Sequence, residues 1–393
     1  MVILKPFRPL YYSGNYENVT SPPFDSISRE LESHLKLCDF NITHLTLPGN
    51  GSAYGKKLML NWKRAGQIVK ADDDSILIIK QKFQFQDRLM IRYGLIGLVA
   101  INPDDGSVKP HEQTFPERVS ERVSVLQNID AQLEPIFIAV NEPDLTKTLI
   151  HFTEHTEPNF SFKDTESVQN CVYLVSDNKV KELMQMLSKC PAMVADGHHR
   201  LEASRSISMK ELGNKERFWS SVMAYITDIN SESLLIGGIH RVLMNDIDTQ
   251  QMIDFVNQFF GATTMPEGEV SNVIELRIKR KSLFFDASSL KGIGYKFISP
   301  VHTLNEIVMK RIHQMNHPRS ELEIQYVHDP ILARKRVDSG EASVAFIMPP
   351  WNRELLFKLV NDRGVLPQKS TYFYPKVASG IAINQFEDRT DIA

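Results

Sequence analysis

The most chemically active stretch of this sequence is AMVADGHHRLEAS, residues 192–204. Five consecutive positions there combine an acid, a glycine, two imidazoles and a guanidinium: Asp196, Gly197, His198, His199 and Arg200. The apolar run before them predicts a buried strand, and an amphipathic helical pattern follows, so the five residues occupy a strand-to-helix turn. Free backbone amides and the positive end of a helix dipole meet at such a turn, and both attract phosphate.

The residue types also suit a phosphate site. Gly197 lets the backbone approach a phosphate without a Cβ in the way, and Arg200 can donate paired hydrogen bonds to phosphate oxygens. His198 and His199 add donors, while Asp196 could hold Mg²⁺ or orient a hydroxyl group. Zinc is a weaker interpretation, because adjacent histidines usually point apart and neither HxxxH nor HExxH spacing occurs here. The alternative without chemistry is a solvated turn with a helix N-cap.

Two further stretches carry candidate residues. VKPHEQTFPERV, residues 108–119, places His111 and Glu112 in a loop before a helix, where Glu112 is either a base or an ordinary exposed acid. VLPQKSTYFYPK, residues 365–376, holds the candidates Lys369, Ser370 and Thr371. The alternative for this second stretch is an irregular edge strand with a surface lysine.

A third stretch, GGIHRVL, places His240 and Arg241 directly after two glycines at a strand end. Such polar residues either complete a site or form a buried His-Arg pair between two domains.

The hydrophobic patterns predict the elements that position these residues. We expect a hairpin over 74–101 with its turn at Gln86-Asp87, and a helix whose N-cap is Ser28. Between about 141 and 170 the polar composition predicts a loop-rich excursion. Further elements are expected as helices at 119–133, 179–189, 248–260 and 303–315, and as strands at 135–140, 192–195, 221–229, 233–243 and 342–350. This mixed order favours an α+β fold with a boundary near residue 240.

Bulk properties exclude some function classes. The chain has 393 residues, 42% of them hydrophobic, and a formal net charge of -3, so no overall positive field exists to hold a nucleic acid. Three cysteines without a CxxC pair argue against a disulfide framework. No apolar run is long enough to span a bilayer, and prolines interrupt the N-terminal stretch. We therefore expect a cytoplasmic protein without a membrane or nucleic-acid partner.

From end to end the sequence resembles a bacterial family of unknown function. The motifs that carry this resemblance are PFRPL at Pro6, SPPFD at Ser21, NITHLTLP at Asn41, KPHEQTFPERVSER at Lys109, VADGHHRLEA at Val194, GGIHRVL at Gly237 and PQKSTYFYPK at Pro367. Three of them, in the order PHEQ, DGHHR and PxKST, also resemble the free L-serine kinases, whose fold is related to the ParB and sulfiredoxin superfamily. The chain differs from the archaeal kinase by roughly a hundred extra residues before PHEQ and by a long insert before DGHHR.

The kinase resemblance implies roles for individual residues. Glu112 would be the base that takes the proton from the serine hydroxyl, and Asp196 a second catalytic acid and tentative Mg²⁺ ligand. Nucleotide phosphates would lie along Gly197, His198, His199 and Arg200. Substrate or phosphate would contact His111, Arg241, Lys369, Ser370 and Thr371.

The implied function is phosphorylation of free L-serine to O-phospho-L-serine with Mg²⁺ and ATP or ADP, a step in amino-acid metabolism such as cysteine biosynthesis. The implied architecture is an N-terminal extension plus a ParB/sulfiredoxin-like nucleotide-binding core over residues 1–240, and a second α/β domain over 241–393. Three alternatives remain. The first is a ParB-like nucleotide-dependent clamp, and the second is a kinase for another small alcohol. The third is a sulfiredoxin-like repair enzyme, but such an enzyme needs a cysteine that the phosphate motif lacks. The oligomeric state is left open.

Overall fold

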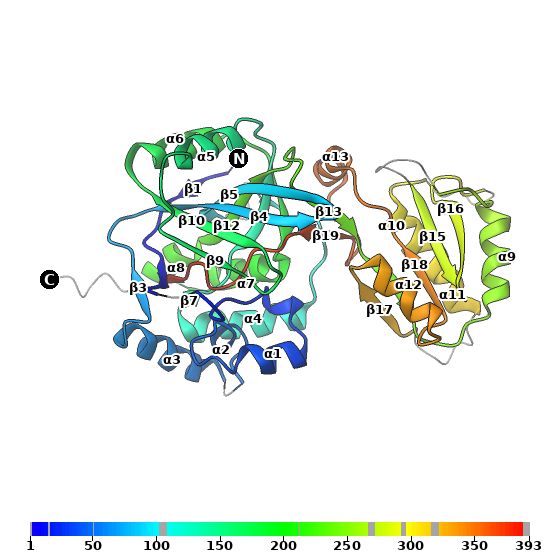
Figure 1. The fold of residues 1–393 in the computed structure, drawn as a ribbon, viewed down its shortest axis with the longest axis horizontal. Helices are drawn as coiled ribbons and strands as arrows, with labels where there is room; N and C mark the ends of the chain where they lie inside the picture. The colour runs from blue at the N-terminus through cyan, green and yellow to red at the C-terminus, as the bar shows by residue number, and fades with distance from the viewer. Residues whose placement is uncertain are drawn as a thin grey trace. The chain divides into compact units, whose positions relative to one another are not determined.

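The computed structural model describes residues 2–14, 16–49, 51–101, 108–211, 213–265, 272–291, 296–315 and 322–387. The chain forms two compact units, Met1–Leu234 with Pro375–Ala393, and Leu235–Tyr374 (Figure 1). We expected one boundary near residue 240, whereas the chain leaves the first unit at Leu234 and returns to it at Pro375. The extreme ends of the two expected domains, residue 1 and residues 388–393, lie outside the described residues.

A large mixed sheet forms the centre of the first unit. Its strands are β1 (Leu4–Lys5), β4 (Ile76–Phe85), β5 (Arg88–Ala100), β6 (Val108–Lys109), β8 (Ile136–Val140), β9 (Phe160–Lys163), β10 (Gln169–Val175), β11 (Ala192–Asp196) and β12 (Ser221–Asp228). They lie in the order β6-β11-β8-β12-β5-β4-β10-β9, with β1 beside β5. β11 is parallel to β6 and antiparallel to β8, and β8 is parallel to β12. A sheet of mixed direction agrees with the expected α+β class.

Helices cover the two faces of this sheet (Figure 1). Helices α5 (Leu145–Thr153) and α6 (Asp177–Leu187) lie on one face, and α4 (Pro116–Ile129), α7 (His198–Ser208) and α8 (Asn214–Trp219) lie on the other. Alternating apolar side chains of the strands make the core under α5 and α6, because successive residues of a strand point to opposite faces. That core includes Ile78, Leu95, Ile138, Val194 and Ala224 from the strands, and Leu149 and Leu183 from the helices.

The remaining elements of the first unit come from the N-terminal region, from the segment after α4 and from the C-terminal segment. They comprise β2 (Leu10–Tyr12), the short helix Phe24–Ser26, α1 (Arg29–Leu35), α2 (Thr43–Thr46), α3 (Ser52–Arg64), β3 (Ile68–Lys70), β7 (Ala131–Gln132) and β20 (Asn384–Gln385). β20 pairs with β7, and Ile383 bridges to Leu10 of β2. Residues 375–387 are therefore part of the first unit, although they are the last described residues.

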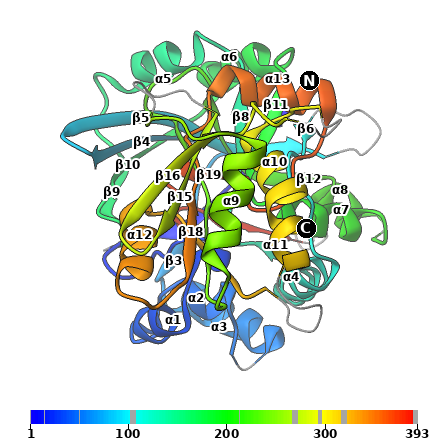
Figure 2. The same ribbon diagram turned by 90° about the vertical axis from the view of Figure 1, so that its right-hand side faces the viewer.

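The second unit has a separate sheet with helices on both faces. Its strands β14 (His240–Leu243), β15 (Val273–Ile278), β16 (Lys281–Asp286), β17 (Ile324–Val327) and β18 (Val344–Ile347) lie in the order β16-β15-β18-β14-β17. Helices α9 (Thr249–Phe259), α10 (Pro300–Thr303) and α11 (Lys310–Met315) pack on one face, and α12 (Pro330–Asp338) packs on the other (Figure 2). A π-helical segment, Leu304–Met309, joins α10 to α11. Strands β13 (Leu235–Gly238) and β19 (Thr371–Tyr374) pair with each other, and α13 (Arg353–Arg363) precedes β19.

Most of the expected elements are confirmed. The hairpin is β4 and β5, and Ser28 caps α1 by accepting a hydrogen bond from the Leu31 amide. The loop-rich excursion expected at 141–170 is wrong, since α5 and β9 lie within it. The single strand expected over 233–243 is also wrong, because β13 and β14 belong to different sheets. Among the described residues, no helix is both long and apolar enough to cross a membrane.

Candidate functional site

The DGHHR motif forms a tight turn between β11 and α7. Strand β11 is buried between β6 and β8, and Gly197 follows it with φ 87° and ψ 29°, a left-handed conformation that disfavours side chains. A Cβ at Gly197 would lie 3.0 Å from Nη2 of Arg200 and 3.0 Å from Cγ2 of Ile136. Glycine is therefore required here both by the backbone and by its neighbours. Helix α7 begins at His198, so its first amides lie beside Asp196.

Two cations hold the carboxylate of Asp196. Its Oδ1 lies 2.9 Å from Nζ of Lys376, and its Oδ2 accepts a hydrogen bond of 3.3 Å from Nη2 of Arg200. Burial alone would raise the pKa of Asp196, but the charges of Lys376 and Arg200 outweigh it and keep this pKa well below its ordinary value. Asp196 is thus ionised at neutral pH. Two cations therefore lie beside this carboxylate at the start of α7.

A buried arginine from the central strand positions the segment that carries Lys376. Arg92 of β5 is completely buried, and its Nη2 donates a hydrogen bond of 2.7 Å to the carbonyl oxygen of Pro375. Its Nε and Nη2 also donate to Oε1 of Gln81 on β4. The guanidinium lies 5.0 Å from the ring centroid of Phe137 and 5.3 Å from that of Tyr225, distances at which cations are attracted to aromatic faces. Lys376 is therefore attached to the sheet through its neighbour Pro375.

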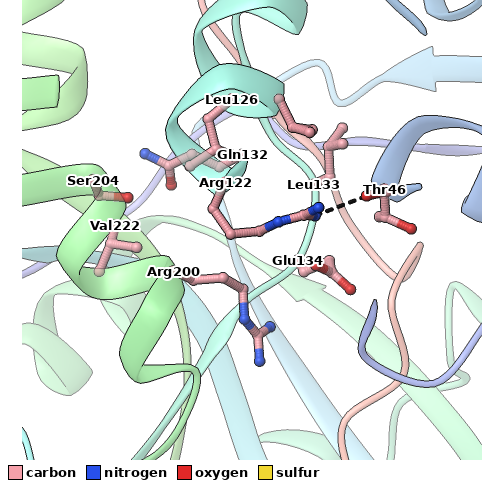
Figure 3. A pocket seen from close by; sticks show the side chains of 10 residues that line it. Thr46, Arg122, Leu126, Gln132, Leu133, Glu134, Arg200, Ser204 and Val222 are labelled. Carbon is pink, nitrogen blue, oxygen red and sulfur yellow. Dashed lines mark hydrogen bonds between the residues drawn. The ribbon is translucent and has the colours of Figure 1, made fainter. Parts of the chain in front are cut away.

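Arg200 also borders a small cavity under α7 (Figure 3). Its Nη1 donates to the carbonyl oxygen of Pro135, whereas its buried Nε has no hydrogen-bond partner. The cavity has a volume of about 20 Å³, enough for one water molecule. Figure 3 shows Arg122 of α4 beside it, donating to Thr46, with Glu134 between the two arginines. A water there would give the Nε of Arg200 the partner that a buried donor needs.

Glu112 lies in the loop between β6 and α4. Its carboxylate Oε1 is 3.7 Å from Nε2 of His111, and 16% of its side chain is exposed. His111 itself is fully buried, and its Nδ1 contacts the carbonyl oxygen of Val194 on β11. The sequence assigned His111 to substrate or phosphate; in this structure its ring faces protein groups.

The two histidines of DGHHR contact this same loop. Nε2 of His198 accepts a hydrogen bond of 3.2 Å from the backbone amide of His111, and Nε2 of His199 accepts one of 3.1 Å from that of Phe115. Burial is the main cause that lowers the pKa of His198 to about 3, and the neighbouring His111 acts in the same direction. The carboxylates of Glu112 and Asp196 act on it in the opposite direction. Both acids therefore lie close to His198, although 84 positions separate them in the sequence.

The other candidates lie in the second unit. Arg241 of β14 is buried, with its guanidinium carbon 5.5 Å from the ring centroid of Tyr326. Lys369 is exposed and has φ 57°, in the left-handed region. Ser370 is buried, with its hydroxyl donating to Pro367 and its carbonyl oxygen accepting from Nε1 of Trp351. Thr371 begins β19. Their roles toward a ligand stay predictions.

The predicted magnesium ligand has only protein partners here. In the part of the chain that the structure describes, no group of three histidine, cysteine, aspartate or glutamate side chains is placed to hold a metal ion. Both oxygens of Asp196 contact cations. Mg²⁺ usually binds to one or two carboxylates and to substrate phosphates rather than to an all-protein site. These residues therefore fit Mg²⁺ only as an ion that a nucleotide brings with it, and Asp196 as its ligand stays a prediction.

Sequence reasoning missed two residues of this site. Lys376 lies inside the motif PQKSTYFYPK, but nothing local shows which of the two lysines in that motif pairs with an acid. Arg92 lies in an alternating strand pattern, where an arginine normally faces water. No local signal in the sequence marks this arginine as buried.

Comparisons with solved structures find similar chains at low identity. One is described as a conserved hypothetical protein from Pyrococcus furiosus, with 14% identity and a TM-score of 0.39, covering 73% of this chain and 94% of that one. Another is a free serine kinase in complex with AMP, with 14% identity, a TM-score of 0.40 and coverage of 70% and 86%. A third is SbnI with a C-terminal truncation from Staphylococcus aureus, with 12% identity, a TM-score of 0.40 and coverage of 75% and 90%. Similarity to solved structures at this level does not establish an activity for this chain.

None of the curated proteins compared with the chain matches it. A protein-family model does match, over residues 4–321, which is most of the chain. The chain therefore belongs to the family described as protein of unknown function DUF1015.

Proposed function

We propose that this protein is a small-molecule kinase that transfers a phosphoryl group from ATP or ADP to the hydroxyl of free L-serine. The observation that carries the proposal is the arrangement around the start of α7. There Asp196 is paired with Lys376 and Arg200, and Glu112 is on a loop that His198 and His199 contact. Both carboxylates act electrostatically on His198. The order of the PHEQ, DGHHR and PxKST motifs supports the same assignment.

The charges suit a phosphate ligand. Lys376 and Arg200 place two cations at the start of α7, and the first amides of α7 add partial positive charge. Phosphoryl transfer proceeds through a loose transition state, so an enzyme mainly positions the reactants and neutralises charge on the transferred oxygens. The two cations and the start of the helix would perform that role. Mg²⁺ would supply further charge neutralisation on the nucleotide phosphates.

Glu112 is the base in this proposal. Its partly exposed carboxylate takes the proton of the serine hydroxyl while the serine oxygen bonds to phosphorus and the phosphoanhydride bond breaks. The nucleotide leaves as ADP when ATP is the donor and as AMP when ADP is the donor. A ParB/sulfiredoxin-like core and a second α/β domain belong to the same proposal.

The test is a product assay with purified protein, Mg²⁺ and either ATP or ADP. L-serine, L-threonine, L-homoserine and L-alanine are compared, and phosphorylated products are detected by ³¹P NMR. We expect O-phospho-L-serine, no product from alanine, and weaker turnover of threonine, because one extra methyl group costs about 1–3 kcal/mol in a fitted pocket. A product only from another alcohol would replace serine as the substrate. Nucleotide binding without a phosphoester in any combination would overturn the kinase and favour a nucleotide-dependent clamp.

A further inference from the structure

The adjacent histidines of the DGHHR turn both use Nε2 toward the backbone of one loop. Nε2 of His198 accepts from the amide of His111 at 3.2 Å and also lies 3.1 Å from Nδ1 of the His111 ring, and Nε2 of His199 accepts from the amide of Phe115 at 3.1 Å. These two amides are on either side of Glu112, one residue before it and three residues after it. The histidines therefore form hydrogen bonds with both ends of the segment 111–115, which carries the proposed base.

The chemistry of these bonds fixes the roles of the ring nitrogens. A backbone amide can only donate, so Nε2 of each histidine must be an unprotonated acceptor, and a neutral ring then carries its proton on Nδ1. An Nε2 that accepts from an amide cannot at the same time donate to a phosphate oxygen. The sequence-based role of these histidines, donation to phosphate, is therefore not available through Nε2 in this arrangement.

Other contacts from β11 and α7 support the same loop. The carbonyl oxygen of Val194 contacts Nδ1 of His111, and Nη2 of Arg205 donates a hydrogen bond of 3.3 Å to the carbonyl oxygen of Val108. The ring of Phe115 stacks on that of His199, with centroids 6.1 Å apart and planes 3° apart. Strand, turn and helix thus contact residues 108, 111 and 115, which surround Glu112.

We infer that His198 and His199 are positioning residues that hold the Glu112 loop through their Nε2 atoms, rather than residues that bind nucleotide phosphates with these atoms. This inference rests on the proposed function for the identity of the base. The loop itself is held whether or not the reaction is phosphoryl transfer. Its geometry can therefore be tested apart from the activity.

The substitutions His199→Gln and His199→Leu separate the two roles, because His199 is only half-buried and tolerates exchange better than His198. The amide oxygen of glutamine can take the place of Nε2 as an acceptor, whereas leucine has none. We expect His199→Leu to lower kcat about three- to tenfold, the effect of losing one exposed hydrogen bond. Nucleotide Kd should change less than about twofold, and His199→Gln should recover most of kcat. A rise in nucleotide Kd equal to the loss of turnover, in both variants, would overturn the inference in favour of phosphate binding.

Hydrogen exchange of the Phe115 amide gives a readout without any substrate. We expect this amide to exchange about tenfold faster in His199→Leu than in the unsubstituted protein, and at nearly the original rate in His199→Gln. Equal exchange in all three proteins would overturn the positioning role even if serine is phosphorylated. Faster exchange in the leucine variant alone, in a protein that phosphorylates nothing, would leave the loop contact standing and defeat the proposed kinase.

His198 provides a second position for the same comparison. This side chain is buried, so His198→Leu can destabilise the whole fold. The leucine and glutamine variants are therefore compared at temperatures equally far below their own unfolding temperatures. We expect the amide of His111 to be protected in the glutamine variant and exposed to exchange in the leucine variant. Protection in both variants would contradict the contact between His198 and the loop.

Discussion

At the scale of single residues, the site depends on how one acid is neutralised. Asp196, at the end of β11, has a cation on each oxygen: Arg200 from the first turn of α7 and Lys376 from a segment 180 positions later. The first pairing joins residues four positions apart across the turn at Gly197, between the end of β11 and the first turn of α7. The second pairing could not be predicted from the sequence, because the pairing of residues so distant in sequence depends on the complete fold.

Replacing Lys376 by methionine tests this pairing. The side chain of Lys376 is only 12% exposed, and its loss leaves the ion pair with Arg200 to neutralise Asp196. We expect the free energy of unfolding to fall by about 1–3 kcal/mol, because a buried carboxylate that loses a charged partner is poorly compensated. Lys376→Arg should recover part of this loss. Chemical denaturation with urea measures it.

The matched control is Lys147→Met, since Lys147 pairs with Asp144 across an exposed surface where the lysine side chain is 81% exposed. That change should stay within about 0.5 kcal/mol. Equal effects at Lys376 and Lys147 would show that the contact with Asp196 does not stabilise the fold.

At the scale of elements, local patterns predicted the strand, the turn and the helix that form the motif. β11 is a short apolar run and α7 begins directly after the glycine, as the sequence indicates. Patterning failed over 141–170, where the polar composition of exposed faces concealed helix α5 and strand β9. It also failed at Ile239, where one apolar run is divided between two sheets. Periodicity describes the faces of an element, but not the sheet to which it belongs.

The substitution Gly197→Ala tests the turn. Alanine is strained at φ 87°, and its Cβ would lie 3.0 Å from Arg200 and from Ile136. We expect a loss of about 2–4 kcal/mol in the free energy of unfolding, the sum of backbone strain and crowding. Gly66→Ala is the control, because Gly66 has φ +70° but nothing within 4 Å of the added Cβ. It should lose only about 1 kcal/mol. Equal losses would mean that the turn has room for a side chain.

At the scale of the whole molecule, the first unit is built from two separate stretches of the sequence, with the second unit between them. Residues 375–387 return to the first unit, where Ile383 bridges to Leu10 and Asn384 pairs with Gln132. The family, whose model matches residues 4–321, could be recognised from the sequence, and so could the α+β class. The return of the last segment could not, because short strands that pair across most of the chain have no local signal. The candidates Arg241 and Lys369 lie in the other unit.

The stability of both units should fall in mild acid. Burial lowers the pKa of His198 to about 3 in the first unit and that of His240 to about 4 in the second. Below the ordinary histidine pKa of about 6.5 the unfolded chain binds protons that the folded rings do not, so stability is complete above that pH and decreases as the pH falls toward 4. The expected slope is about 1 kcal/mol per pH unit for each ring.

Substitution of His240 isolates one of these contributions. Asparagine can still accept the hydrogen bond of 3.0 Å that the amide of Met348 donates to Nδ1, but it does not titrate. Urea unfolding of His240→Asn at pH 7, 6 and 5 should therefore show a shallower pH dependence. The same change at His155, whose side chain is 91% exposed, should leave the slope unaltered because that ring stays in water. An unchanged slope in His240→Asn would refute the buried neutral ring.

The most direct test of the central claim is the effect of Glu112→Gln on turnover and on nucleotide binding, measured in the same preparation. Glutamine preserves the shape of the side chain but cannot take a proton. A positioned base contributes about 10²–10⁴ in rate, so we expect kcat for O-phospho-L-serine formation to fall by about that factor. The nucleotide Kd from calorimetry should stay within about twofold, because the base acts on the acceptor. Undiminished turnover, or lost nucleotide binding with turnover per bound complex preserved, would contradict Glu112 as the base.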